Sequence, residues 1–206
     1  MFRSNLIILF EQIWPTVLIC MVVLESIRIT WLIKNNKELV LYKELLIMGF
    51  TVYIMCLFYV VTFQDVSWST SNFTPFKEIL RYDIGSAKFF KNVIGNMVMF
   101  VPFGFFISYF FRLSKLKVIF FLTLIASVTI EVTQYKIGRV FDIDDILLNL
   151  LGGLAGYYLY KLLSYISDKL PRFLKKPLFY NIIIIVFLII MVLYLFNIIK
   201  LGVLSE

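Results

Sequence analysis

Histidine is absent from the sequence, and the chain has only two cysteines and 16% charged residues. Without imidazole the protein has no histidine general base and no histidine metal ligand, and two isolated cysteines do not make a cysteine-based zinc site. We therefore expect neither a metal nor a cofactor. Cys20 and Cys56 lie inside apolar runs, where we expect them to act as small hydrophobic side chains rather than as a disulfide.

Apolar residues dominate the sequence, because 61% of the chain is hydrophobic, with 22 Phe and 12 Tyr. The mean hydropathy of +0.92 exceeds what the core of a soluble domain needs and indicates an integral membrane protein. The formal net charge of +7 comes from basic residues that lie between apolar segments rather than on one face. That distribution follows the positive-inside rule and does not favour a nucleic-acid partner.

Six segments are long and apolar enough to cross a bilayer core, which takes about 20 residues for a thickness of about 30 Å. They are residues 6–33, 45–63, 93–111, 118–134, 146–164 and 181–199. The sequence thus predicts an all-α polytopic membrane helix bundle with about six transmembrane helices. We divide it into residues 1–64 with two helices, a core of residues 65–166 with a loop and three helices, and residues 167–206 with a basic linker and the last helix.

The orientation follows from the lysines and arginines in the connections. Eleven of them lie in the loops after the first, third and fifth spans: Lys34, Lys37, Lys43, Arg112, Lys115, Lys117, Lys161, Lys169, Arg172, Lys175 and Lys176. Short basic loops stay in the cytoplasm, so we expect both termini outside the cell. The longest connection, residues 64–91, then faces outwards and is expected to carry a short amphipathic helix around residues 76–82 in the membrane interface.

Ionisable and amide side chains gather at the junction of the fourth and fifth spans, facing the start of the third. Such groups at membrane depth are costly and are treated as functional by default. This predicted polar cluster consists of Glu131, Gln134, Arg139, Asp142, Asp144, Asp145 and Asn149, with Asn92 and Asn96 opposite. Because Asp at a helix start accepts from free backbone N–H groups, we expect one of the three aspartates to be a helix cap.

Small residues next to this cluster predict close helix packing. Gly152 and Gly156 form a G-x-x-x-G pair, which lets a second helix approach closely within a membrane. We expect their face, with Asn149, to pack against the Asn92/Asn96 face of the third span. Farther along that span come Pro102 and Gly104, and Pro102 should bend the helix and free a carbonyl or two.

Two interpretations of the cluster stay open. In one it is a structural network in which Arg139 neutralises Glu131 or Asp142. In the other, four carboxylates around one arginine leave an excess of negative charge that a cationic or hydroxyl-rich ligand would balance, so that Glu131 and Arg139 form a functional pair. Away from the cluster, Glu25 and Arg28 are three residues apart and are expected to form a local ion pair.

Several short motifs follow one another along the chain: residues 72–76 (NFTPF), 92–96 (NVIGN), 100–104 (FVPFG), 131–134 (EVTQ), Arg139, 142–145 (DIDD) and 149–152 (NLLG). Their order and spacing resemble the VanZ-like family of bacterial membrane proteins, and the resemblance covers about residues 72–160. It implies a multi-pass protein of the bacterial plasma membrane, of the kind associated with resistance to the glycopeptide teicoplanin. The lipid tail and the cell-wall target of teicoplanin both lie at the outer leaflet.

The leading hypothesis is therefore an outer-leaflet polar pocket that engages a lipid-linked envelope component, such as a cell-wall precursor, or a lipoglycopeptide antibiotic, among ordinary membrane lipids. The alternative is a transporter or flippase for a polyprenyl-phosphate-linked lipid, which needs a polar path, whereas the middles of spans two, four and six are interpreted as apolar. A third hypothesis is an intramembrane acid/base enzyme using Glu131 and a nearby aspartate. It ranks last because no metal-ligand set or activated nucleophile is visible. The ligand and the oligomeric state stay open.

Overall fold

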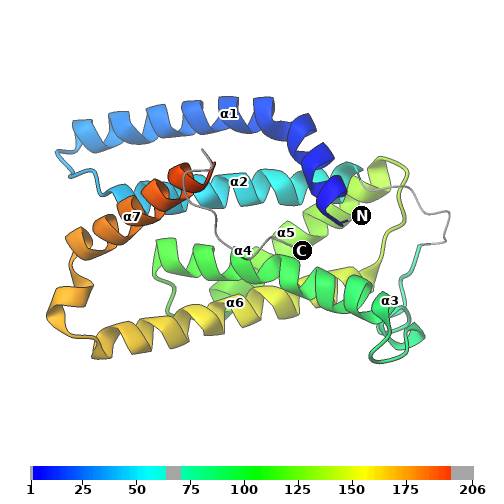
Figure 1. Ribbon diagram of the computed structural model, residues 1–206. Helices are drawn as coiled ribbons and strands as arrows, with labels where there is room; N and C mark the ends of the chain where they lie inside the picture. Colours follow the sequence, from blue (N-terminus) through cyan, green and yellow to red (C-terminus); the bar gives the residue numbers. More distant parts are fainter. Residues whose placement is uncertain (1, 64–70, 196–206) are drawn as a thin grey trace. The chain divides into compact units, whose positions relative to one another are not determined.

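The computed structural model describes residues 2–63 and 71–195, and these are helical apart from short connections. The longer helices are α1 (Phe2–Lys34), α2 (Leu41–Phe63), α4 (Gly95–Phe111), α5 (Leu116–Lys136), α6 (Ile143–Lys169) and α7 (Pro177–Leu195), drawn in Figure 1. The shorter ones are η1 (Ile79–Arg81), α3 (Ala87–Phe89), the π-helix η2 (Phe90–Ile94) and η3 (Arg172–Lys175). The predicted all-α class is confirmed.

Five helical segments are long and apolar enough to cross a membrane: Trp14–Lys34, Leu41–Tyr59, Ala87–Phe111, Leu116–Lys136 and Ile143–Lys169. The chain is thus a multi-pass membrane protein. The third span begins at Ala87 rather than at the predicted residue 93, because α3, η2 and α4 run on without a break. The predicted sixth span, residues 181–199, corresponds to α7, and its last four residues lie outside the described residues.

The chain divides into two compact units. The first contains Met1–Ile13 and Val52–Ile166, and the second contains Trp14–Thr51 and Ser167–Glu206. The first unit holds all the residues of the predicted polar cluster.

In the second unit, α1 and α2 are joined by an ion pair. Arg28 Nε lies 3.2 Å from Glu44 Oε2 on α2, and Glu44 is 7% exposed. The sequence predicts an ion pair between Arg28 and Glu25, but Arg28 pairs with Glu44 instead. Glu25 is only half-buried, and the more deeply buried carboxylate of Glu44 needs a cation more. In the same unit the backbone N–H of Tyr42 donates to Asn181 Oδ1 of α7 at 3.0 Å.

In the first unit, glycines bring the backbones of α4 and α6 together. A methyl group added at Gly152 would strike the carbonyl oxygen of Met97, and one added at Gly156 would strike the carbonyl oxygen of Val101. A methyl group at Gly104 would strike the backbone of Gly153 in the same way. The predicted packing of the G-x-x-x-G face against the third span is confirmed, and Gly104 is its counterpart on α4.

Pro102 lies inside α4, which continues through it. Because proline lacks an N–H group, hydrogen bonding in the turn before it is weakened. Three residues earlier, the carbonyl of Met99 accepts a hydrogen bond of 2.6 Å from the hydroxyl of Tyr53 on α2. Tyr53 and Met99 also pack against the buried pair of Leu57 and Phe100, so this contact joins α2 to the bundle of α4, α5 and α6.

Candidate functional site

One face of α5 carries a buried stripe at a spacing of four residues. Ile119, Thr123 and Ser127 are 0% exposed and Glu131 is 1% exposed. Residues four apart lie on the same side of a helix, and this side faces α6. A methyl group added at Gly153 of α6 would strike Thr123, which shows how closely the two helices pack there.

Toward the end of α5 the stripe makes polar contacts with α6 and its first turn. Ser127 Oγ accepts from Asn149 Nδ2 at 2.9 Å. One turn on, Glu131 Oε2 accepts from the backbone N–H of Asp142 at 3.0 Å. Two buried atoms of this region, Thr123 Oγ1 and Asn149 Oδ1, have no hydrogen-bond partner among the described residues.

These contacts correct two predictions. Asn149 was expected to face the Asn92/Asn96 side of the third span, but its amide donates to Ser127 on α5. Asn149 lies four residues before Gly153, whose side of α6 faces Thr123 of α5, while Gly152 and Gly156 lie against α4. The middle of the fourth span is also not apolar where it is buried, because Thr123 and Ser127 line it.

Asp142 is the cap of α6 that the sequence predicts for one of the three aspartates. Its Oδ1 accepts from the backbone N–H of Asp144, the second residue of the helix, at 2.9 Å. Asn72 Nδ2 donates to the same oxygen at 2.9 Å. The backbone N–H of Asn72 also donates to Phe141 O at 2.8 Å, and that of Ile143 donates to Asn72 O at 3.1 Å. The loop before α3 is thus attached to the start of α6.

The pKa of Asp142 lies above its ordinary value. Burial is the largest cause, and the negative charges of Asp144 and Glu78 add to it. The hydrogen bonds from the Asp144 backbone N–H and the Asn72 side chain oppose the rise without cancelling it. When Asp142 is ionised, its buried charge therefore lowers the stability that its capping hydrogen bond contributes.

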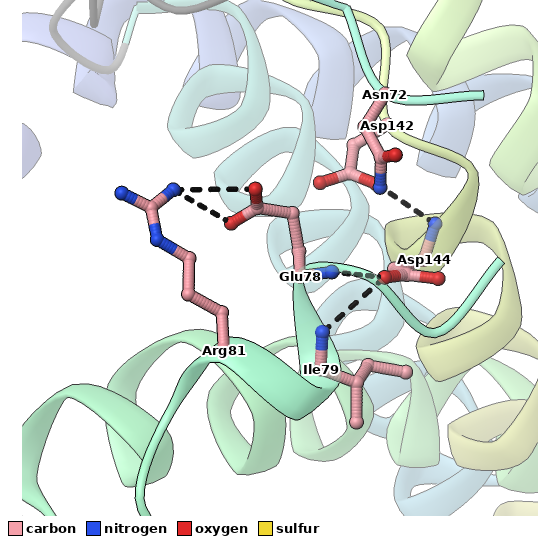
Figure 2. Close-up of polar contacts among 6 residues, drawn as sticks. All are labelled: Asn72, Glu78, Ile79, Arg81, Asp142 and Asp144. Carbon is pink, nitrogen blue, oxygen red and sulfur yellow. Dashed lines mark hydrogen bonds and ion pairs between the residues drawn. The ribbon is translucent and has the colours of Figure 1, made fainter. Parts of the chain in front are cut away.

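Asp144 fixes the loop more firmly. Asp144 is only 1% exposed, and its Oδ1 accepts from the backbone N–H of Phe76 at 2.5 Å. Oδ2 accepts from the N–H groups of Glu78 at 2.7 Å and Ile79 at 3.2 Å (Figure 2). Hydrogen bonds to an ionised acceptor are roughly twice as strong as neutral ones, so these three hold the α2–α3 loop, described from residue 71 to residue 86, against α6.

Asp145 connects α6 to α4. Its Oδ1 accepts from Asn96 Nδ2 on α4 at 2.5 Å. Gln134 is buried at the end of α5, and its backbone carbonyl oxygen accepts from the backbone N–H of Arg139 at 2.9 Å. Glu131, Asp142, Asp144, Asp145 and Asn96 therefore form one junction of α4, α5, α6 and the α2–α3 loop.

Asn92 is the predicted cluster residue that lies elsewhere. It lines an open cavity of about 560 Å³ with Arg81, Tyr82, Asp83, Ser86, Lys88 and Lys91. We call this cavity the basic groove. The amphipathic helix predicted around residues 76–82 is only the 3-10 turn η1, because Asp144 holds the N–H groups of Phe76, Glu78 and Ile79.

Sequence reasoning missed the contacts of three residues beside the junction: Asn72, Thr123 and Ser127. The four-residue recurrence of Thr123, Ser127 and Glu131 is a visible signal for the last two. Asn72 belongs to the motif at residues 72–76, but nothing near it in the sequence indicates its partner Asp142, which lies 70 positions away. Among the described residues, no group of three or more Cys, Asp or Glu side chains is placed to hold a metal ion.

Comparison with known proteins gives one match. A protein-family model described as VanZ/LLP1 matches residues 50–164, more than half of the 206 residues. The matched stretch contains all five residues of the junction and includes the residues on which the sequence resemblance rests. Neither the curated proteins nor the solved structures contain a match to this chain.

Proposed function

Because this chain belongs to the VanZ/LLP1 family, we propose that it acts in the bacterial plasma membrane and contributes to resistance of the teicoplanin type. Its junction would lie at the outer leaflet, with both termini outside the cell. There it would engage a lipid-linked envelope component or a lipoglycopeptide antibiotic. Both kinds of ligand bring a lipid tail and a polar head to that depth.

The observation that carries this proposal is the one-sided distribution of charge in the bundle. Glu131, Asp142, Asp144 and Asp145 all belong to the junction, at one end of α5 and α6. The connection at the other end of α5 contributes the basic residues Arg112, Lys115 and Lys117 and no carboxylate. A bundle whose only task was to span the membrane would have no need of four carboxylates at one end.

The four carboxylates differ in what their contacts require. Asp142 caps a helix and Asp144 binds three loop amides, so both have structural roles. Glu131 accepts from one backbone N–H and Asp145 from one amide, and a neutral carbonyl can also accept those bonds. The carboxyl groups of Glu131 and Asp145 are therefore the ones that support a role in ligand binding.

The test is protection of living cells. Expressed in a teicoplanin-susceptible Gram-positive host, the wild-type chain should raise the minimum inhibitory concentration of teicoplanin more than that of a glycopeptide without a lipid tail. Glu131→Gln should abolish the protection at an unchanged amount of membrane protein. Glu25→Gln, the same change in the second unit, is the matched control and should protect normally. Arg139→Lys should also reduce protection if a planar guanidinium holds a carboxylate or phosphate.

Two results would contradict the proposal. If the wild-type chain gives no protection, the resistance role is wrong. If Glu131→Gln, Asp145→Asn and Arg139→Lys all protect like the wild type at equal protein levels, the junction is not the site. Loss of protein from the membrane in Glu131→Gln would assign Glu131 to the fold instead.

The buried stripe of α5 favours a second candidate, a flippase for a polyprenyl-phosphate-linked lipid. Thr123 and Ser127 continue the polar face of Glu131 towards the middle of the helix, and Thr123 Oγ1 has no hydrogen-bond partner among the described residues. Reconstituted in vesicles, a flippase should move a fluorescent polyprenyl phosphate between leaflets. The double change of Thr123 and Ser127 to Val should stop that movement, and an unchanged leaflet distribution with the wild-type chain would exclude this function.

A further inference from the structure

The basic groove lies outside the junction and carries an excess of positive charge. Arg81, Lys88 and Lys91 line it, against the single carboxylate of Asp83. Arg81 is partly neutralised, because its NH1 lies 3.2 Å from Glu78 Oε2 (Figure 2). Lys88 and Lys91 make no ion pair with any residue that the structure describes. Two cations are thus available to a ligand in the groove.

Hydroxyl groups in the groove add uncharged donors. The Oγ of Ser86 accepts from the backbone N–H of Phe89 at 3.1 Å and still has its own proton to donate. Tyr82, which also carries a hydroxyl group, lines the same groove. Ammonium and hydroxyl donors around a cavity of about 560 Å³ suit a tetrahedral oxyanion such as a phosphate group.

The length of the third span places the groove at the level of lipid headgroups. The span Ala87–Phe111 has 25 residues, so as a helix it is about 37 Å long. A bilayer core is about 30 Å thick, and the first turns of the span, with Lys88 and Lys91, therefore extend into the headgroup layer. Lysine side chains at such a position extend toward the interface.

Large apolar side chains are exposed next to the groove residues in the chain. Leu80 is 81% exposed, Ile84 is 90% exposed and Phe90 is 57% exposed. Each is next to or within two residues of a groove residue: Leu80 precedes Arg81, Ile84 follows Asp83, and Phe90 lies between Lys88 and Lys91. In a membrane interface these side chains have acyl chains to contact, which favours a lipid over a water-soluble anion.

We propose that the basic groove binds the phosphate group of a membrane lipid, with Lys88 and Lys91 on the phosphate and Leu80, Ile84 and Phe90 against the acyl chains. The site is separate from the junction, and it does not depend on the function proposed above. Lipid binding by the purified chain and protection against teicoplanin are measured separately, so the failure of one leaves the other standing.

The experiment is native mass spectrometry of the full chain in detergent, titrated with dioleoylphosphatidylglycerol. Dioleoylglycerol, which has the same acyl chains and no phosphate, is the reference lipid. A basic residue near a membrane surface contributes enough that losing two should weaken binding of an anionic lipid by about thirtyfold. We therefore expect K88Q/K91Q to bind phosphatidylglycerol about thirtyfold more weakly and to bind dioleoylglycerol as the wild type does.

Two matched variants make the result specific. K115Q/K117Q removes the same amount of charge from two exposed lysines at the start of α5 and should leave phosphatidylglycerol binding unchanged. K88R/K91R keeps the charge and should keep the affinity. Both lysines of the groove are exposed, so thermal unfolding should be the same in all variants.

Three outcomes would overturn the proposal. An equal loss of affinity in K88Q/K91Q and K115Q/K117Q would mean general attraction of anionic lipid to a basic protein. Unchanged affinity in K88Q/K91Q would mean that the groove does not hold the phosphate. If inorganic phosphate binds the chain as tightly as phosphatidylglycerol does, the ligand is the free anion rather than a lipid.

Discussion

The carboxylate of Asp144 accepts a hydrogen bond of 2.7 Å from the backbone N–H of Glu78, 66 residues earlier in the chain. The same carboxylate holds the N–H groups of Phe76 and Ile79. A loop between two membrane helices usually satisfies its backbone groups with water. Here a buried side chain on α6 takes that place, so the loop and the bundle are fixed to each other.

The first prediction tests that attachment. In Asp144→Asn one of the two oxygens becomes an NH₂ group, which faces N–H donors and leaves at least one of them unsatisfied. The loss should be about 2–3 kcal/mol of stability, because a buried donor to a charged acceptor is stranded. We expect a lower unfolding temperature in detergent and faster cleavage by trypsin at Lys77 and Arg81, both exposed.

Asp83→Asn is the matched control, because Asp83 is an exposed aspartate near the loop's end. It should leave both the unfolding temperature and the trypsin cleavage rate unchanged. Equal cleavage rates in Asp144→Asn and the wild type would mean that the loop is held by other contacts.

Much of the fold is predictable because a membrane leaves helices few alternatives. Apolar length alone indicates the spans, and small residues at a spacing of four indicate the close contact through Gly152 and Gly156. The start of the third span was predicted six residues late, because Lys88 and Lys91 interrupt the apolar run. A helix can continue through two lysines when its first turns extend into the headgroup layer.

The site is only partly predictable, and the reason is the distance along the chain between its contacts. The sequence indicates which carboxylates gather near α5 and α6, since they are close together in the chain. It does not indicate that Asp144 binds backbone groups of residues 76–79, because a backbone N–H leaves no signature in the sequence. For the same reason the cap could not be assigned among three aspartates, whereas hydrogen bonding identifies it as Asp142.

The second prediction concerns the contact of α4 with α6. In Gly156→Ala the new methyl group would strike the carbonyl oxygen of Val101 and the backbone nitrogen of Phe105, and neither backbone atom can move without shifting a helix. Overpacking of this kind costs about 1–3 kcal/mol, so the unfolding temperature and the folded yield should fall. Gly49→Ala is the control, because a methyl group there meets nothing within 4 Å and alanine favours the helix. A stable Gly156→Ala protein would mean that α4 and α6 lie farther apart.

The third prediction concerns orientation, which follows from the basic loops. In a chain whose native Cys20 and Cys56 are replaced, a cysteine at Asp83 should react with a membrane-impermeant maleimide in intact cells. A cysteine at Ser114, in the exposed turn between α4 and α5, should react only after the cells are opened. The opposite pattern would put the junction and the basic groove in the cytoplasm and would exclude a ligand at the outer leaflet.

The last prediction uses the raised pKa of Asp142. A carboxyl group whose pKa is higher in the folded than in the unfolded chain stabilises the fold most when it is protonated in both states, below the ordinary Asp value of about 3.9. That contribution is lost as the pH rises through the raised pKa. Asp142→Asn imitates the protonated form, and its carbonyl can still accept from the Asp144 N–H and from Asn72. Asn is also a favoured helix cap.

Asp142→Asn should therefore unfold at the same temperature as the wild type in acid and at an equal or higher temperature at neutral pH. The comparison is the difference between the two unfolding temperatures at each pH, because the other carboxylates of the junction titrate in both proteins. Asp142→Ala is the control for the cap itself and should be about 1 kcal/mol less stable than Asp142→Asn at every pH, since no side-chain acceptor remains and neither variant titrates at this position. The prediction is wrong if Asp142→Asn is destabilised at neutral pH as much as Asp142→Ala. In that case the ionised carboxylate of Asp142 attaches the loop through Asn72, and its charge stabilises the folded chain.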